Sequence, residues 1–529
     1  MNQAEIKRRQ AQEVSNILAL VIICMAGHLV GEKGITYTAV AAECCLLVWT
    51  AVCGELSDGL GRLLRARRNK GQYRNIVRMR GTALAVQAAL GAAGSAALFF
   101  GADWIGEGIF NIPCSVLILK VLSPAVLLRS LTCAVTGYFQ GEGAELPRAV
   151  AGIMRQLFIL GFGLLFCKIL GDYGQKVSGL LRQENYAAMY SGVGIALAVC
   201  LADFFILLFL VIIFKGSRRN ERKLRQEGMY SADSRWDCVR FLCMGRWPQA
   251  VSSFMTVFPM VSGLLLFGWK AREGTAEITV YGLYAGKYLV VCGVLVCVIS
   301  LLLLPVVGRI FLCFRRNENR FAKTVFMSGV HAGLVYGIFL TVYVGVMGGR
   351  IADILSKENG ETVKQMLQGG ACVILFAGLS LYFGRFLHTA GKRYPVLAAL
   401  CLANVVYFAA AVLLSEAGIL SLVYGGAAGM FVLCILLGVF SFRQMWVKAD
   451  WLSLLIVPLG AGAAAGGVCA LMGLAPLGDP VMLPLAFAVS GAVYWGLLLA
   501  LRNFKEQELE VIPGGRLIGA LGQRLRFYS

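Results

Sequence analysis

Charged residues are scarce in this chain of 529 residues, and acidic ones are the scarcer kind. Only 15% of residues are charged against 58% hydrophobic, and Lys and Arg outnumber Asp and Glu by 49 to 29. So apolar a composition excludes an ordinary soluble domain of this size. Repeated apolar runs of about 20 residues predict membrane-spanning helices. The runs do not alternate with period two, which excludes a transmembrane β-barrel.

The residues and motifs of common catalytic sites are also missing. There are only three histidines, far apart in sequence, and none of the 17 cysteines forms a C-x-x-C pair. The sequence contains no Walker A motif, no dinucleotide-binding glycine motif and no H-E-x-x-H. We therefore expect no metal, no cofactor and no enzymatic activity, and nothing supports ATP-driven transport by this chain alone.

Two parts of the chain resemble each other at an offset of 248 residues. Arg67-Arg68-Asn69 aligns with Arg315-Arg316-Asn317, and Pro147 aligns with Pro395. Six apolar runs precede a basic linker and six follow it, so the halves have the same orientation in the membrane. We expect the halves to superpose, with both prolines at equivalent helix starts.

The predicted fold is therefore all-α and polytopic, with about fourteen transmembrane helices in two pseudo-symmetric six-helix bundles plus two C-terminal helices. The first two helices are expected at 14–32 and 36–58, and the fifth at 147–171. The predicted divisions are a six-helix lobe, a basic cytoplasmic linker, a second six-helix lobe, two extra helices and a cytoplasmic tail, at 1–214, 215–240, 241–441, 442–502 and 503–529.

Basic clusters set the expected orientation. They fall in the N-terminus and in alternate loops, at Lys7 to Arg9, Arg62 to Arg80, Lys215 to Arg225 and Arg315 to Lys323. The positive-inside rule then places both termini in the cytoplasm. Attraction to anionic membrane lipids accounts for these clusters, and we expect no nucleic-acid partner.

Charges inside the apolar runs mark the candidate site. Arg129, Arg155 and Lys287 lie in apolar helices, where a charge is costly unless it faces protein or water. The planar fork of arginine suits pyrophosphate oxygens, so we expect these three cations to line one central, anion-binding cavity between the halves. Lys120 belongs to the same binding set, or reaches the membrane surface with a purely structural role.

Two buried acids accompany the cations. Glu43 and Asp203 either neutralise a buried cation or bind a coupling Na⁺ or H⁺. We favour an ion pair with Arg129 or Arg155, because an unpaired charge in a membrane is costly.

Four short motifs, in order, resemble a known family. They are Gly31-Glu32-Lys33-Gly34 with Tyr37, the basic stretch Leu63 to Tyr73, Gly137-Tyr138-Phe139-Gln140-Gly141 with Pro147, and Leu509 to Gly515. Together they resemble the MOP flippase superfamily, in the branch of stage V sporulation protein B and MurJ-type flippases. Departures include Thr136, where the family has arginine, so residue roles cannot be copied wholesale.

The resemblance implies a flippase in a bacterial cytoplasmic membrane. Its cargo would be a lipid-linked oligosaccharide: lipid II or a polysaccharide unit on undecaprenyl pyrophosphate. The alternatives are a multidrug or organic-cation antiporter of the same superfamily, which would need a net acidic site, and a non-transporting scaffold for cell-envelope synthesis.

Overall fold

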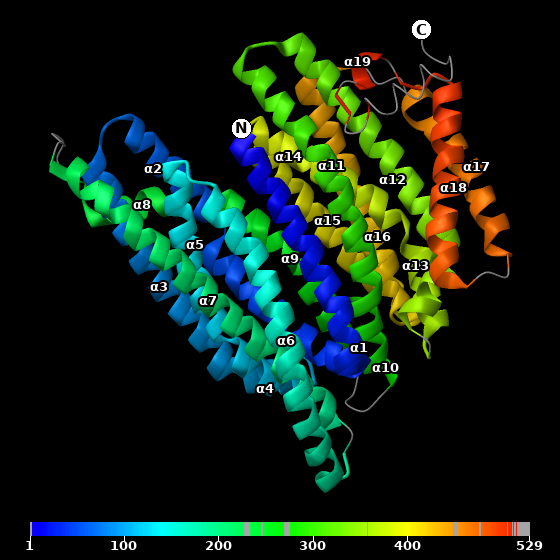
Figure 1. The fold of residues 1–529 in the computed structure, drawn as a ribbon, viewed down its shortest axis with the longest axis horizontal. Coiled ribbons are helices and arrows are strands. Elements are labelled where there is room, and N and C mark those ends of the chain that lie inside the picture. The colour runs from blue at the N-terminus through cyan, green and yellow to red at the C-terminus, as the bar shows by residue number, and fades with distance from the viewer. Residues whose placement is uncertain are drawn as a thin grey trace. The chain divides into compact units, whose positions relative to one another are not determined.

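The computed structural model describes residues 3–54, 56–183, 185–226, 233–244, 247–268, 276–356, 358–447, 452–475, 478–504, 506–509, 511, 512 and 515. Parts of the expected linker, 227–232, and of the expected tail, 516–529, lie outside these residues. Within the described chain all regular elements are helical, and thirteen are long and apolar enough to cross a membrane (Figure 1). The expected all-α polytopic membrane fold is confirmed.

The contacts divide the chain into two compact units, which are residues 21–286 and residues 1–20 with 287–529. Both divisions fall inside helical segments, in α1 (Gln3–Cys53) and in η2 (Tyr284–Tyr288). The expected lobes rest on the sequence repeat rather than on contacts, and they stay a prediction. Besides residues 21–53 of α1, the 21–286 unit contains α2 (Leu56–Asn69), α3 (Tyr73–Asp103), η1 (Trp104–Ile109), α4 (Cys114–Leu122), α5 (Pro124–Glu142), α6 (Leu146–Leu181), α7 (Asn185–Gln226), α8 (Arg235–Met244), α9 (Trp247–Gly268) and α10 (Ala276–Leu283).

The other unit holds the start of α1 and the C-terminal helices. These are α11 (Leu289–Arg315), α12 (Asn319–Leu355), α13 (Gly360–Gly370), α14 (Cys372–Thr389), α15 (Arg393–Leu413), η3 (Ser415–Ala417), α16 (Leu420–Met445), η4 (Leu452–Ile456), α17 (Val457–Gly473), α18 (Asp479–Ala500) and α19 (Glu506–Leu509). A partly buried ion pair between Arg385 of α14 and Glu13 of α1 joins the N-terminal segment to this unit.

One of the thirteen spans corresponds to two of the fourteen expected helices, because α1 is a single element with a kink inside it. Gly31 has φ 76° and ψ 169°, which breaks the helix between the two expected runs. Such a positive φ favours glycine. Three residues later, a Cβ on Gly34 would lie 2.2 Å from Cγ1 of Val30. Gly31 is therefore favoured by the backbone conformation, and Gly34 by the close approach of the Val30 side chain.

Helix α6 is longer than predicted. It continues ten residues past the expected end at 171 and reaches Leu181, giving 36 residues. At 1.5 Å per residue this is about 54 Å, well beyond the ~30 Å hydrocarbon core. The added turns pack on α7: Tyr173 and Tyr190 meet edge to face at 5.2 Å. In Figure 1 this helix pair extends past the ends of α3 and α4.

Glycines of the Gly-Tyr-Phe-Gln-Gly motif bring α5 close to α2. A Cβ on Gly137 would lie 3.0 Å from the carbonyl oxygen of Ser57, and one on Gly141 would lie 2.5 Å from Cβ of Leu64. Tyr138 is fully buried against Arg80 of α3 and Phe214 of α7, and it donates a hydrogen bond to Glu142 at 2.7 Å. The motif thus has a packing role in addition to any functional one.

The turn that follows this motif recurs 248 residues later. Gly143 (φ 81°) and Gly391 (φ 76°) end α5 and α14, respectively, in the left-handed region. In each turn the glycine N–H bonds the carbonyl three residues earlier, and the next N–H bonds the carbonyl five residues before it. Pro147 and Pro395 then lie in the first turns of α6 and α15. The backbone pattern therefore repeats where the sequence matches are few.

The two C-terminal membrane helices are tied together by a cation. Arg350 of α12 pairs with Asp479 of α18 at 2.9 Å and donates to the carbonyls of Gly473, the last residue of α17, and of Ala475 just beyond it. Near the end of α18, His331 lies 3.2 Å from Glu508 and 2.8 Å from Asn503. His331 thus has the hydrogen-bonded packing role that is usual for a buried histidine.

Candidate functional site

A carboxylate between two guanidinium groups forms the centre of the candidate site. Asp203 of α7 accepts a hydrogen bond at Oδ2 from Nε of Arg129 of α5, at 2.8 Å. Nε of Arg155 of α6 pairs with Oδ1 of the same carboxylate, and its Nη2 lies 3.4 Å from Oδ2. Three helices therefore converge on one acid, and the expected ion pairing of Asp203 with Arg129 and Arg155 is present.

The two arginines present their outer edges away from this carboxylate. Only 3% of the Asp203 side chain is exposed, against 21% for Arg129 and 23% for Arg155. Neither guanidinium makes another hydrogen bond within the described residues. The cluster carries a net charge of +1, and both arginine side chains are partly exposed. Such an array is suited to binding an oxyanion.

The local sequence explains why these side chains meet. Arg129 lies seven residues before Thr136, nearly two turns, so both are on the same side of α5. On α7, the small residues Ala198 and Ala202 are buried beside Asp203 and allow close helix contact. Two like charges would repel each other, so Asp203 is what holds the arginines together.

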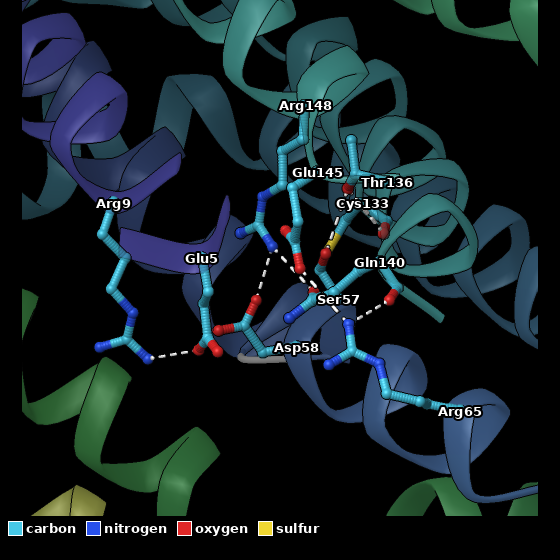
Figure 2. A network of polar contacts seen from close by, with 10 residues as sticks. All are labelled: Glu5, Arg9, Ser57, Asp58, Arg65, Cys133, Thr136, Gln140, Glu145 and Arg148. Atoms are coloured by element: carbon cyan, nitrogen blue, oxygen red, sulfur yellow. Dashed lines mark hydrogen bonds and ion pairs between the residues drawn. The ribbon is translucent and has the colours of Figure 1, made fainter. Parts of the chain in front are cut away.

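A second polar cluster lies at the α5–α6 turn (Figure 2). Nη1 of Arg148 donates to Oδ1 of Asp58 at 2.5 Å and to Oε1 of Gln140 at 3.0 Å. Nearby, the hydroxyls of Ser57 and Thr136 are 3.2 Å apart. The cluster links the first turns of α2 and α6 to the end of α5.

Arg65 of α2 completes this second cluster. Its Nη2 donates to the carbonyl oxygen of Gln140 at 2.7 Å and lies 3.4 Å from Oε1 of Glu145. Nearly half of the Arg65 side chain is exposed. The second cluster therefore reaches the surface of the 21–286 unit.

The remaining predicted site residues lie elsewhere. Glu43 is buried and accepts a hydrogen bond from the Tyr281 hydroxyl at 3.0 Å rather than pairing with an arginine. Lys120 pairs with Asp103 at 2.8 Å in a largely exposed position. Lys287 is buried in η2 and belongs to the other unit, so the expected common cavity stays a prediction.

Sequence reasoning did not connect the partners of two ion pairs, Arg148–Asp58 and Arg385–Glu13. Arg148 and Asp58 lie within a turn of helix ends, where charges usually meet water, so nothing in the pattern distinguished them. Arg385 was missed because it lies close to the end of α14, beside the basic loop that follows. Its partner Glu13 is 372 residues away.

Comparisons with known proteins find similarity in the fold of this chain but not in its sequence. No family model matches the chain, and no curated protein matches it either. The lipid II flippase MurJ, in an inward closed conformation, superposes with a TM-score of 0.66 at 11% identity, covering 93% of this chain and 100% of that chain. A multidrug-resistance MATE transporter of the MOP superfamily, inward-facing, gives 0.62 at 11% identity, covering 84% and 98%. This chain has the MOP transporter fold.

The shared fold alone does not decide what this chain does. A MOP superfamily transporter from Pyrococcus furiosus, described as having a binding pocket of reverse polarity that suggests a different function, also matches, with a TM-score of 0.53 at 12% identity over 84% of this chain and 98% of that one. Because the sequence identities are low, function has to be argued from the residues of this chain.

Proposed function

We propose that this chain is a transporter rather than an enzyme. Its proposed cargo is an anionic lipid-linked glycan precursor, such as lipid II or a polysaccharide unit on undecaprenyl pyrophosphate. The proposed location is a bacterial cytoplasmic membrane, and the proposed mechanism is alternating access. The observation that carries this proposal is the Arg129–Asp203–Arg155 cluster, because its outward N–H donors and net positive charge suit a diphosphate.

The diphosphate would use the donors that Asp203 leaves free. A guanidinium that gives its Nε edge to a carboxylate keeps N–H groups on its Nη atoms, which can form charge-assisted bonds to phosphate oxygens. The partly exposed arginines make these donors accessible, while the buried Asp203 keeps them in place. In the absence of cargo, Asp203 offsets part of the cost of two neighbouring cations inside a membrane.

Glu43 is the feature that favours the alternative cargo. A buried carboxyl whose hydrogen-bond partner is Tyr281 could be protonated or hold Na⁺, which suits either ion coupling or an organic-cation antiporter. We assign it to coupling by Na⁺ or H⁺, because the arginine cluster disfavours a cationic cargo. A non-transporting scaffold is the remaining alternative.

The direct test of the proposal is transport by the purified protein in liposomes. We expect fluorescent lipid-linked diphosphate glycans to cross the bilayer, and a lipophilic cationic dye to show no protein-dependent movement. Liposomes without protein are the control for spontaneous movement. Transport of the dye and not of the lipid would establish the antiporter, and transport of neither would favour the scaffold.

Orientation can be tested by cysteine labelling. We propose that residues 215–240 lie in the cytoplasm and residues 349–365 outside, as the basic clusters indicate. A membrane-impermeant maleimide should therefore label Lys364→Cys in intact cells, but Arg222→Cys only after permeabilisation. The side chain of Arg222 lies outside the described residues, whereas Lys364 is exposed on α13. The native cysteines should be replaced first. Labelling of position 222 from outside would reverse the orientation and the direction of transport.

A further inference from the structure

Arg148 has the same local arrangement as the two central arginines. Its side chain is 27% exposed, and the hydrogen bonds that it makes within the described residues all leave from one nitrogen, Nη1. Nε and Nη2 are left over. Like Arg129 and Arg155, it is therefore a guanidinium held on one side by an acid, with donors remaining on the other.

Its position relative to Arg155 is fixed by helix geometry. The two residues are seven apart in α6, so they lie on the same side of the helix, about 10 Å apart along its axis. On α5, Thr136 is seven residues from Arg129 and lies toward the same α5–α6 turn. Arg155 and Arg129 meet at one level through Asp203. Arg148 therefore lies about two helical turns from that level, toward the α5–α6 connection. It donates a hydrogen bond to Gln140, which is one helical turn beyond Thr136.

At the level of Thr136 along α5, the cation is supplied by Arg148 of the neighbouring helix α6. Thr136 itself bonds Ser57 and offers no charge. Beyond Arg148, toward the surface, Arg62, Arg65 and Arg68 of α2 are exposed. Within the 21–286 unit, positive side chains therefore follow one another from the exposed part of α2 to Arg148 and then to the Arg129–Arg155 level. Acids accompany these cations, since Arg65 lies 3.4 Å from Glu145 and Arg68 lies 4.0 Å from Glu142, but the arginines outnumber the acids that pair with them in the described residues. A path with such an excess of positive charge attracts an anion and guides it inward.

We propose that Arg148, with the amide of Gln140, forms an outer anion subsite that receives the diphosphate head group before it reaches Arg129 and Arg155. This inference rests on the proposed function and adds a second binding step to it. Asp58 occupies the outer subsite when it is empty, as Asp203 does at the inner one. The arriving diphosphate competes with Asp58 for the guanidinium.

The main competing explanation is a structural ion pair that only joins α2 to α6. The two roles differ in what happens when both charges are removed together. A structural pair tolerates the neutral double variant Arg148→Gln/Asp58→Asn better than either single variant, because neither member of the pair is left behind as a charge without the other. A binding subsite does not, because the guanidinium itself contacts the anion.

The experiment measures initial transport rates in liposomes over a range of concentrations of a fluorescent lipid-linked diphosphate glycan. We expect Arg148→Gln to raise the half-saturating concentration about tenfold, the effect of losing one charge-assisted contact, with a smaller change in the rate at saturation. The double variant should remain as impaired as Arg148→Gln. Lys364→Gln, which removes an exposed cation of α13, is the matched control and should behave as wild type.

Binding of inorganic pyrophosphate by calorimetry in nanodiscs distinguishes the source of the anion. Asp58→Asn should lower the dissociation constant severalfold, because Arg148 is released from its competitor. If pyrophosphate binds as described, the head group alone is recognised; if only a polyprenyl diphosphate shows the Arg148 dependence, the lipid tail is part of recognition. Both results support the outer subsite. They differ in whether its ligand is the diphosphate alone or the diphosphate with its polyprenyl tail.

Three results overturn the subsite. They are a double variant with wild-type kinetics, an Arg148→Gln variant with an unchanged half-saturating concentration, and an Asp58→Asn variant with unchanged affinity for both anions. If Arg155→Gln abolishes transport in the same preparation, the proposed function survives this failure. If Arg155→Gln and Arg148→Gln both transport at the wild-type rate, the arginine cluster is not the cargo site; if the wild-type protein does not transport the lipid, the proposed function fails too.

Discussion

Transport is expected to fall to background when Arg129 or Arg155 is replaced by alanine, although the protein still inserts into the membrane. Each substitution removes charge-assisted hydrogen bonds to the cargo, which are worth about 1.5–3 kcal/mol each, and leaves Asp203 to neutralise the remaining arginine. The net charge of the cluster then drops from +1 to zero. A diphosphate would meet no excess positive charge at this level.

Lysine substitutions distinguish charge from geometry at these positions. Arg129→Lys and Arg155→Lys keep the charge but lose the planar fork, so we expect partial transport. The measurement is protein-dependent movement of the fluorescent lipid-linked glycan in liposomes, with membrane insertion checked by protease protection. Wild-type transport by both alanine variants would contradict the assignment of the cargo site to the Arg129–Asp203–Arg155 cluster.

Asp203→Asn is expected to be the most destabilising single substitution in the site. It leaves two guanidinium groups side by side in a membrane-embedded position without a counter-charge. Removing one partner of a buried ion pair typically costs about 3–5 kcal/mol of folding free energy. The Tm of the protein in detergent, followed by the reaction of buried cysteines with a thiol-specific dye, should fall by several degrees.

A second substitution checks the cause of this loss. In Asp203→Asn/Arg155→Gln a single cation remains, so part of the lost Tm should return, because repulsion between the arginines is removed. Glu361→Gln, which breaks an exposed ion pair on α13, should leave Tm almost unchanged. An unchanged Tm in Asp203→Asn would mean that the arginines are well solvated and do not need the carboxylate.

The central cluster could be predicted from the sequence because membrane helices offer few charges to choose from. Arg129, Arg155 and Asp203 lie deep in apolar runs, and an acid at that depth has almost no other partner. Glu43 was harder: its partner Tyr281 is 238 residues away and uncharged, so no pattern connects the two. Arg148 and Asp58 were missed because charges near helix ends are common and normally contact water.

Some parts of the fold could likewise be predicted from the sequence and others could not. Apolar length predicted the helices, including a break between the runs 14–32 and 36–58, and the structure places this break at Gly31, where a positive φ favours glycine. The extension of α6 to Leu181 was not predicted, since residues 172–181 are not apolar enough to resemble a membrane span. Their helicity depends on packing against α7, which is a tertiary effect.

The recurring turn at Gly143 and Gly391 bears on how far sequences of this fold can diverge. Its hydrogen bonds join backbone to backbone, so the surrounding side chains are free to change, and only the glycine is held by its positive φ. Gln-Gly-Glu-Gly-Ala in one copy and His-Thr-Ala-Gly-Lys in the other share a single residue. Helices connected by such backbone turns can therefore keep their arrangement even when almost no sequence similarity remains.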